Sequence, residues 1–502
     1  MSIWRTKPVD QVPDKEESKG LRRSLGAFEL TALGVGAIIG TGIFVLTGVA
    51  AARFAGPGII FSFIIAGVGS ALAALVYAEL ASAVPVAGSA YTYTYVAVGE
   101  LIAWLIGWNL VLEYTVAAGA VSVGWSAYFG NMLQSIGLVL PHWAVASPLA
   151  GGLVNLPAIG IALIVTGLLV LGTKESVLIN SIVVFVKLAV IALFIAIGVF
   201  HVSPANWKPL LPFGPGGVVR GAAIIFFAYI GFDAVSTASE EVRNPQRNLP
   251  IGIIASLLIS TTLYIVVAII LTGIVRYTGL NTAAPVATAL LAAGVAWASG
   301  IVSVGALAGL TSVLLVMLYG QSRIFFAMSR DGLLPDVFAK VHPRFKTPFL
   351  ITTITGLVVA ALSGFLPVTV LAEMANIGTL SAFLVVAIGV IVLRRTNPEL
   401  PRPFRTPFVP YLPVISFLFS LYLMINLPLL TWIRFVIWVT IGFVLYFAYG
   451  YRHSRLAVAP GPPGEAARLR PIPALKPLKA SQEKNDSQTG EQPDNETGEP
   501  AE

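Results

Sequence analysis

Charged residues are scarce and cysteine is absent in this chain of 502 residues. Asp, Glu, Lys and Arg make up 11% of the residues, whereas a typical soluble domain carries about 25%. The absence of cysteine excludes disulfides, thiolate metal sites and thiol chemistry. Only four histidines occur and none belongs to an HExxH motif, so we expect no metal and no metal enzyme.

Long hydrophobic runs make up most of the chain, and 56% of the residues are hydrophobic. About 20 apolar residues in a helix span the hydrocarbon core of a bilayer. Twelve apolar segments occur, near residues 27–53, 59–82, 99–130, 156–174, 177–200, 218–240, 251–275, 288–320, 349–366, 370–395, 411–431 and 433–451. We therefore predict an all-α integral membrane protein with twelve transmembrane helices.

Polar segments flank this predicted transmembrane domain, which runs from 25 to 452. Residues 1–24 are charged and carry no cleavable signal pattern, so we predict a cytoplasmic arm. Residues 453–502 are rich in Pro, Glu, Lys and Gln and poor in aromatics, which predicts a disordered cytoplasmic tail.

The distribution of Lys and Arg predicts the orientation of the helices. If the N-terminus is inside, 18 of these residues fall in inner segments and 5 in outer ones, before the tail is counted. The excess on one side predicts that both termini are cytoplasmic. The net charge of +7 is then explained by topology, and nucleic acid is not expected as a partner.

Glycine is concentrated inside the first apolar segment, where residues 34–44 read GVGAIIGTGIF. Glycine in a helix interior costs about 1 kcal/mol of stability relative to alanine. A helix that only anchors the protein in the membrane is therefore not expected to contain several glycines at its centre. An opened helix frees N–H groups that attract a carboxylate and carbonyls that attract an ammonium group. The alternative is close helix packing through the Gly36 and Gly40 pair. A dinucleotide loop is excluded because no strand precedes it.

A second unusual helix is predicted in the sixth segment, where residues 224–234 read IIFFAYIGFDA. Here Asp233 follows Gly231 at the depth of the membrane. Segments one and six are each the first of five if segments 1–5 and 6–10 are repeats. Paired interrupted helices at matching positions indicate a transporter site at the interface of two repeats.

Three charged residues lie within apolar segments, where a charge costs about 2.5–3.5 kcal/mol on insertion scales. They are Lys187, Glu113 and Asp233. Lys187 lies too far from either end of its segment to reach the headgroups easily, although snorkelling is the alternative. Burial favours a neutral lysine, so Lys187 could bind and release a proton, and a cation there would replace sodium. For the two acids, the alternative is a structural hydrogen bond.

The chain resembles the amino acid–polyamine–organocation (APC) superfamily, and most of all the bacterial cationic amino acid transporter (CAT) family. The resemblance runs from about 20 to 450. The matching stretches are GAIIGTGIF (36–44), AGSAYTY (87–93), IGFD (230–233), EEVRNPQRNLPIG (240–252), MSRDGLLP (328–335) and HPRFKTP (342–348). It implies alternating access and a LeuT-type fold, with inverted repeats at about 27–200 and 218–395 and two extra helices at 411–451.

The resemblance also implies roles for residues of the two glycine-containing segments. The backbone N–H groups near Thr41 and Gly42 would bind the substrate carboxylate. Carbonyl groups near Ile38, Phe227 and Ile230 would bind the substrate ammonium group. Phe227 would also serve as an aromatic gate.

Three further residues match positions of the family, and a fourth, Met317, bears on specificity through its size. Lys187 matches a lysine thought to couple protons in sodium-independent relatives. Glu113 and Asp233 match acidic positions near the side-chain end of the site. Met317 would occupy volume that a long cationic side chain needs, which favours small neutral amino acids such as alanine; the alternative is that Met317 only packs.

These observations predict a secondary active transporter of the plasma membrane that imports a small neutral L-amino acid with a proton and without sodium. Its predicted partners are the amino acid, protons and the lipid bilayer, and no cofactor is expected. The sequence does not say whether a small membrane subunit is also a partner. An amino acid exchanger, including one for cationic amino acids, is the first alternative. A channel or a non-transporting sensor on the same scaffold is the second. A membrane enzyme is disfavoured because no nucleophile–base or metal cluster is visible at membrane depth.

Overall fold

The computed structural model describes residues 4–8, 25–84, 88–172, 177–237, 239, 242–342 and 347–458. The predicted arm beyond 4–8, nearly all of the predicted tail and parts of three of the motifs lie outside these residues. Within them, the chain forms helices and two isolated β-bridges but no strand. The predicted all-α class is therefore confirmed for the part of the chain that the structure describes.

Helices occupy all twelve of the predicted apolar segments. The long ones are α1 (Ala27–Ile38), α3 (Ile59–Ala83), α5 (Glu100–Ser135), α7 (Leu156–Leu171), α8 (Val177–Gly198), α9 (Gly214–Ile225), α11 (Pro245–Ile274), α13 (Ala296–Arg330), α14 (Phe349–Phe365), α15 (Val368–Thr396), α16 (Tyr411–Ile425) and α17 (Leu429–Leu445). Shorter helices are α2 (Thr47–Ala50), α4 (Ser89–Ala97), α6 (His142–Val145), α10 (Ala234–Thr237), α12 (Pro285–Ala292), α18 (Tyr451–His453) and α19 (Arg455–Val458).

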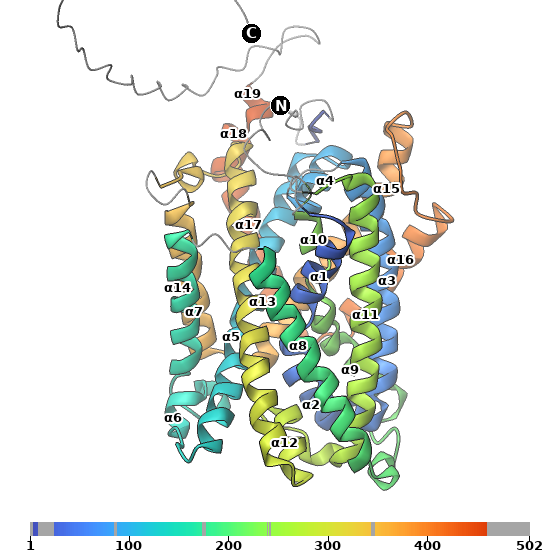
Figure 1. The fold of residues 1–502 in the computed structure, drawn as a ribbon. Coiled ribbons are helices and arrows are strands. Elements are labelled where there is room, and N and C mark those ends of the chain that lie inside the picture. Colours follow the sequence, from blue (N-terminus) through green and yellow to red (C-terminus); the bar gives the residue numbers. More distant parts are fainter. Residues whose placement is uncertain are drawn as a thin grey trace, which may run out of the picture. The chain divides into compact units, whose positions relative to one another are not determined.

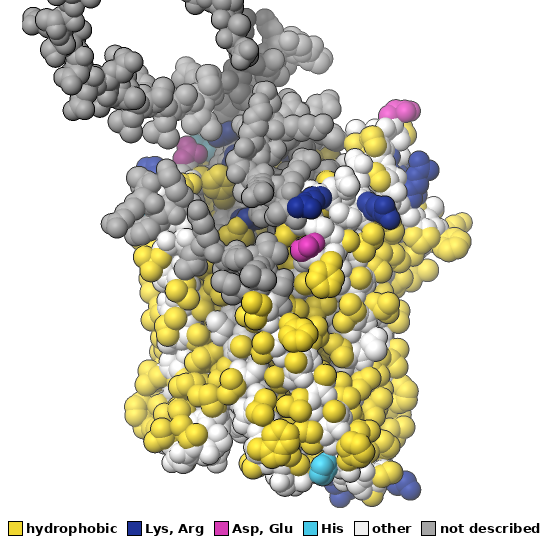
Figure 2. Space-filling view, in the orientation of Figure 1, with side chains coloured by type: hydrophobic (Ala, Val, Ile, Leu, Met, Phe, Trp, Pro, Cys, Tyr) yellow, Lys and Arg dark blue, Asp and Glu magenta, His cyan; other side chains and the backbone are white. Residues whose placement is uncertain are grey.

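The helices have the lengths and surfaces of a multi-pass membrane protein. Eight helical stretches among the described residues are long and apolar enough to cross a bilayer, and four more apolar helices have 10–17 residues. Figure 2 shows hydrophobic side chains over the side of the molecule, while Lys and Arg gather toward its ends. Exposed apolar side chains such as Phe185, Leu418 and Val444 would face lipid in this arrangement.

The long helices pack around α1 and α9, which lie in the middle of the bundle (Figure 1). The most extensive helix pairs are α5 with α13, α5 with α15 and α3 with α11. Helix α1 packs against α11 and α8, and α9 packs against α3 and α15. Both α1 and α9 are therefore enclosed by other helices, which exposes their interruptions to protein rather than to lipid.

Segments near both ends of the described chain meet at one end of the bundle. Lys7 Nζ lies 2.8 Å from Asp331 Oδ1, at the end of α13, and Tyr91 donates a hydrogen bond of 2.7 Å to the same carboxylate. Arg455 N donates to Asp331 O at 3.1 Å. Asp331 thus joins the N-terminal segment, α4 and the beginning of α19, which places residues 4–8 and 455 on the same side of the bundle.

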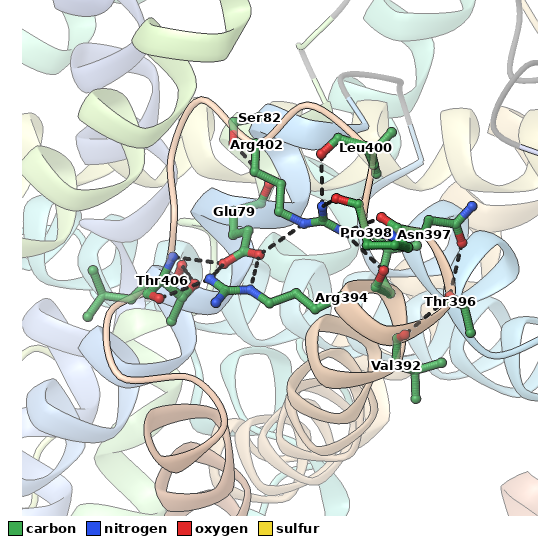
Figure 3. A network of polar contacts seen from close by, with 12 residues as sticks. Glu79, Ser82, Val392, Arg394, Thr396, Asn397, Pro398, Leu400, Arg402 and Thr406 are labelled. Carbon is green, nitrogen blue, oxygen red and sulfur yellow. Dashed lines mark hydrogen bonds and ion pairs between the residues drawn. The ribbon is translucent and has the colours of Figure 1, made fainter.

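A buried carboxylate joins α3 to the loop between α15 and α16 at this end of the bundle (Figure 3). Glu79 is 1% exposed and accepts two hydrogen bonds from Arg394, at 2.8 and 2.7 Å. Arg402 Nε lies 3.5 Å from Glu79 Oε1, and Thr406 N donates to Oε2 at 2.7 Å. The fork of Arg394, at the end of α15, matches a carboxylate in this two-bonded geometry, and together with Arg402 and Thr406 of the loop it fixes both α15 and the loop to α3.

We expect the Glu79→Gln substitution to destabilise the fold, because it leaves Arg394 and Arg402 without a buried counter-charge. Removing one partner of a buried ion pair costs about 3–5 kcal/mol. The low end applies here because the Arg394 side chain is 27% exposed. Thermal unfolding in detergent would measure the loss. Glu399→Gln, at an exposed position of the same loop, is the control and should unfold like the wild type.

Candidate functional site

The first broken helix lies where the glycine-rich stretch predicts it. Helix α1 ends at Ile38, and Ile39 is extended, with φ −78° and ψ 96°. The chain resumes as a π-helical turn at Gly42–Leu46, followed by α2. The carbonyls at the end of α1 and the N–H groups at the start of the next turn therefore lack regular helical partners.

The second broken helix follows α9. After Ile225 the chain forms a 3₁₀ turn over Phe226–Tyr229, and Ile230 is extended, with φ −61° and ψ 135°. Gly231 has φ +117°, a conformation that only glycine adopts readily, and the chain then turns into α10. The glycine of this segment is thus needed by the backbone itself.

The two breaks are in direct contact with each other. A Cβ placed on Gly42 would lie 2.3 Å from Ala228 Cα, and one on Gly231 would lie 3.0 Å from the carbonyl carbon and oxygen of Ala37. Each break therefore carries one glycine that lets the backbone of the other approach. This contact brings polar backbone groups of both helices to one place inside the helix bundle.

A small cavity lies at this meeting point. It is lined by Ala37, Ile38, Gly40, Thr41, Gly42, Ala117, Val121, Phe227, Ile230, Val313 and Met317. The cavity is small and has room for about one water molecule in this conformation. The lining contains six of the predicted substrate-binding residues, namely Ile38, Thr41, Gly42, Phe227, Ile230 and Met317.

The walls of the cavity differ in chemistry. Thr41 is fully buried and its hydroxyl oxygen has no hydrogen-bond partner among the described residues. Backbone groups of the two breaks supply further polar atoms. The opposite wall consists of Ala117, Val121, Val313 and Met317 from α5 and α13, which are apolar. A ligand with one polar end and one short apolar end fits this distribution.

Tyr264 of α11 links the two breaks through its hydroxyl group. Its oxygen lies 2.8 Å from Ile38 O and 2.7 Å from Ala228 O, and the side chain is fully buried. A tyrosine hydroxyl has one proton, so the two carbonyls share a single donor. One of the two carbonyls is thus incompletely satisfied at any moment and remains available to another donor, such as an ammonium group.

We expect the Tyr264→Phe substitution to weaken binding of the amino acid that the sequence predicts as the ligand here, because Ile38 O and Ala228 O would lose the donor that holds them together. Leaving buried acceptors unsatisfied costs roughly 1–3 kcal/mol, and each 1.4 kcal/mol is a factor of ten in affinity. The KM for uptake should therefore rise by about tenfold while the maximal rate changes less. Tyr422→Phe, at an exposed position of α16, is the control. An unchanged KM in Tyr264→Phe would contradict this role.

Lys187 is fully buried in α8, and it contacts the first break. Its Nζ donates to Gly36 O at 2.6 Å and to Ile39 O at 3.1 Å. Gly309 of α13 packs on the side chain, since a Cβ there would lie 3.2 Å from Lys187 Cβ. The lysine therefore does not snorkel to a headgroup; it satisfies carbonyls that the break has freed.

Glu113 and Asp233 lie near each other but outside the lining of the cavity. Tyr114 donates to Asp233 Oδ2 at 3.4 Å, and Glu113 Oε1 has no hydrogen-bond partner among the described residues. Glu113 precedes the cavity-lining Ala117 by four residues, which is one helical turn, about 6 Å. Glu113 is thus about one helical turn away from a residue of the cavity lining, and Asp233 follows the cavity-lining Ile230 by three residues.

Several residues that line or connect the cavity carry little or no signal in the sequence. Ala117, Val121 and Val313 are apolar residues in apolar helices, and no sequence signal distinguishes their lining role from packing. Tyr264 carries a weak signal, because a tyrosine at the middle of a transmembrane helix must satisfy its hydroxyl group. Its partner carbonyls could not be identified, since Ile38 is 226 positions away.

Comparison with known proteins identifies the family. Residues 25–448 match the family model described as "Amino acid permease". The chain is 51% identical over 457 residues to the methylthioribose transporter of Bacillus subtilis (strain 168), covering 91% of this chain and 99% of the relative. It is 50% identical over 463 residues to the branched-chain amino acid permease BcaP of the same organism, with coverage of 91% and 99%.

More distant relatives extend the match to eukaryotes. The vacuolar cationic amino acid transporter 4 of Arabidopsis thaliana is 34% identical over 581 residues, covering 91% of this chain and 96% of that protein. These relatives agree with the resemblance drawn from the motifs. A multi-pass chain of this kind belongs to a family of transporters rather than of enzymes. The chain is a member of the amino acid permease family of the APC superfamily.

Proposed function

We propose that this permease is a secondary active transporter that imports a small neutral amino acid together with a proton and without sodium. The observation that carries the proposal is the contact between two broken helices at a cavity, with Lys187 bonded to the carbonyls of the first break. We further propose twelve transmembrane helices arranged as two inverted repeats of five, with α16 and α17 as extra helices. Alternating access would then open the cavity to each side in turn.

The polar groups of the breaks would bind the backbone of the amino acid. N–H groups near Thr41 and Gly42 begin a helical turn, where the helix dipole favours a carboxylate. Carbonyl groups of Ile38, Phe227 and Ile230 would accept from the ammonium group. Phe227 lines the cavity and would cover the substrate as a gate.

Lys187 would couple transport to protons. In its charged form it satisfies two carbonyls of the first break, and loss of the proton would weaken that bond and release the end of α1. A permanent cation at this position would also occupy the place that a sodium ion could take. Uptake should therefore be indifferent to sodium at fixed pH, and stimulation by sodium would contradict the proposal.

The proposed substrate class follows from the apolar wall of the cavity. Met317 and its neighbour Val313, one helical turn away, leave little room for a side chain. Alanine and similar small neutral amino acids are favoured for this reason. Glu113 and Asp233, which lie outside the cavity lining, would meet the side chain of a longer substrate if Met317 were smaller.

We expect the Met317→Ser substitution to widen the substrate range toward cationic amino acids, because it enlarges the cavity that Met317 lines. Competition by arginine against labelled alanine should appear in the variant and be absent in the wild type. Met374→Ser, on α15 and outside the cavity, is the control. If arginine competes no better in Met317→Ser, this methionine only packs and the size argument fails.

Two relatives suggest a second candidate for the substrate. They are about half identical to this chain and are named for branched-chain amino acids and for methylthioribose. An apolar wall of valines and a methionine also suits a branched side chain or a methylthio group. Competition by leucine, valine and methylthioribose in the same assay would separate these substrates from alanine.

The proposed location is the plasma membrane, with both termini in the cytoplasm. The excess of Lys and Arg in the segments predicted to be internal supports this orientation. Protease protection in oriented vesicles, with a tag at each terminus, would test it.

Counterflow in proteoliposomes tests transport itself. Labelled alanine should accumulate transiently in vesicles preloaded with unlabelled alanine, and the rate should saturate. A channel would not show saturable counterflow, and a sensor would bind alanine without moving it. An exchanger would show counterflow but would not concentrate alanine in response to a pH gradient.

A further inference from the structure

The end of the second broken helix accepts hydrogen bonds from a buried asparagine side chain, Asn376. Asn376 lies in α15, and its side chain is fully buried. Its Nδ2 donates to Ala223 O at 2.8 Å and to Ile224 O at 3.0 Å. These are carbonyls at the end of α9, directly before the second break. Both amide protons of Asn376 are therefore donated to carbonyl groups at the end of one helix.

This arrangement parallels the contact between Lys187 and the first break. Lys187 donates to Gly36 O, two residues before the end of α1 at Ile38. Asn376 donates to Ala223 O, two residues before the end of α9 at Ile225. In each case a single buried donor group bonds two carbonyls at the end of a broken helix.

The positions of the two donors in the fold also correspond. Counted over the predicted segments, α8 is the fifth helix of the first proposed repeat and α15 is the fifth of the second. Helices α1 and α9 begin the same two repeats. Each repeat therefore satisfies the end of its own first helix with a polar residue from its own fifth helix.

We infer that Asn376 is the counterpart of Lys187 in the second repeat, a positioning residue that fixes the end of α9 and, through it, the cavity-lining Phe227 and Ile230. The inference rests on the proposed transport function. An amide neither gains nor loses a proton in the physiological range, whereas an amine can. The first break, bonded by Lys187, is thus the one that responds to protonation. The end of α9, bonded by Asn376, stays fixed throughout the transport cycle.

Removing the amide has a specific structural consequence. A regular α-helix would bond Ala223 O and Ile224 O to the N–H groups of residues 227 and 228. Here Asn376 donates to both carbonyls, Ile224 O also accepts from Phe226 N–H, and the chain continues as a 3₁₀ turn. Without the amide, α9 can continue as a regular α-helix beyond Ile225. This change would turn Phe227 away from the cavity, and substrate binding would weaken as a result.

Two variants test the inference by alanine counterflow at equal pH inside and outside. Asn376→Leu keeps similar volume but donates no hydrogen bond, and its KM should rise at least tenfold. Asn376→Asp keeps the shape and donates a hydrogen bond only when its carboxyl group is protonated. Its counterflow should therefore fall at least tenfold between pH 5.5 and pH 8, over and above any change in the wild type.

Asn109→Asp is the matched control for the effect of pH. Asn109 is also buried and bonds α15, but it donates to the Ser381 hydroxyl group rather than to a helix end. The ionisable groups on α15 and on the elements packed against it are Glu373, Arg394 and Arg395 of α15, Tyr77 and Glu79 of α3, Tyr91, Tyr93 and Tyr95 of α4, Glu100, Glu113, Tyr114 and Tyr128 of α5, Arg220 of α9, Tyr229 of the 3₁₀ turn, Tyr411 and Tyr422 of α16, and Arg434 of α17; Asp233 lies next to Glu113 in this region. All of them are present in both variants, so a pH profile seen only in Asn376→Asp belongs to the new carboxyl group.

The outcomes separate the inference from the proposed function. Counterflow by wild type, with an acid-dependent Asn376→Asp and an unaffected Asn109→Asp, supports the inference. The same pH profile in all three proteins, or an unchanged KM in Asn376→Leu, overturns it and leaves transport intact. Absence of counterflow in wild type refutes the proposed function instead. If Asn376→Leu does not fold, the pH profile of the isosteric Asn376→Asp decides.

Discussion

The Lys187→Ala substitution should abolish the response of alanine uptake to an inward proton gradient. The ammonium group of Lys187 makes two hydrogen bonds to carbonyls of the first break, at 2.6 and 3.1 Å, and is fully buried. A hydrogen bond to a charged group contributes about 1.5–3 kcal/mol, so losing two of them corresponds to a factor of about 100 or more. Uptake driven by an acidic exterior should fall by at least that factor.

Lys208→Ala is the control, because Lys208 is an exposed lysine of the loop before α9. It should take up alanine like the wild type. Proton-driven uptake that persists in Lys187→Ala would mean that the lysine is structural. Uptake that ignores the pH gradient in wild type, but requires amino acid preloaded inside, would make the protein an exchanger.

The Gly42→Ala substitution should have the next largest effect, because it separates the two breaks. The added methyl group would lie 2.3 Å from Ala228 Cα and 3.1 Å from Ala228 N. Those are backbone atoms of the second break, which cannot move aside as a flexible side chain does. Overpacking of this kind costs about 1–3 kcal/mol, and here the strain falls on the cavity itself. We expect the KM for alanine to rise at least tenfold.

Gly300→Ala in α13 provides the matched comparison. Apart from Gly300 itself, its two chain neighbours and the nearby backbone of its own helix, no atom lies within 4 Å of a Cβ placed on Gly300. The same methyl group would therefore meet open space there. Gly300→Ala should bind and transport alanine like the wild type. If Gly42→Ala retained the KM of the wild type, close approach of the two breaks would not be a condition for substrate binding.

Sequence reasoning located the two breaks because glycine leaves a direct signal. Gly42 is required by close approach and Gly231 by a positive φ, and both effects act on the residue itself. Lys187 was recognisable for a similar reason, since a charge in an apolar segment needs a partner. In these cases a local physical cost pointed to the site before any contact was known.

The parts that could not be predicted depend on contacts between distant segments. Asn376 and Ala223 are 153 positions apart, and an asparagine in a membrane helix is consistent with many interhelical bonds. Glu113 and Asp233 lie near each other and outside the cavity lining, so their predicted place at the side-chain end of the site stays a prediction. The rotation of a helix around its axis decides such positions, and spacing alone does not give it.

Uptake of labelled alanine into proteoliposomes in the absence of sodium tests the central claim most directly. Vesicles with an acidic exterior should concentrate alanine, and vesicles with the opposite gradient should not. Concentration under the first gradient alone is the result that the account predicts. Equal uptake under both gradients, or uptake that appears only when sodium is added, would contradict it.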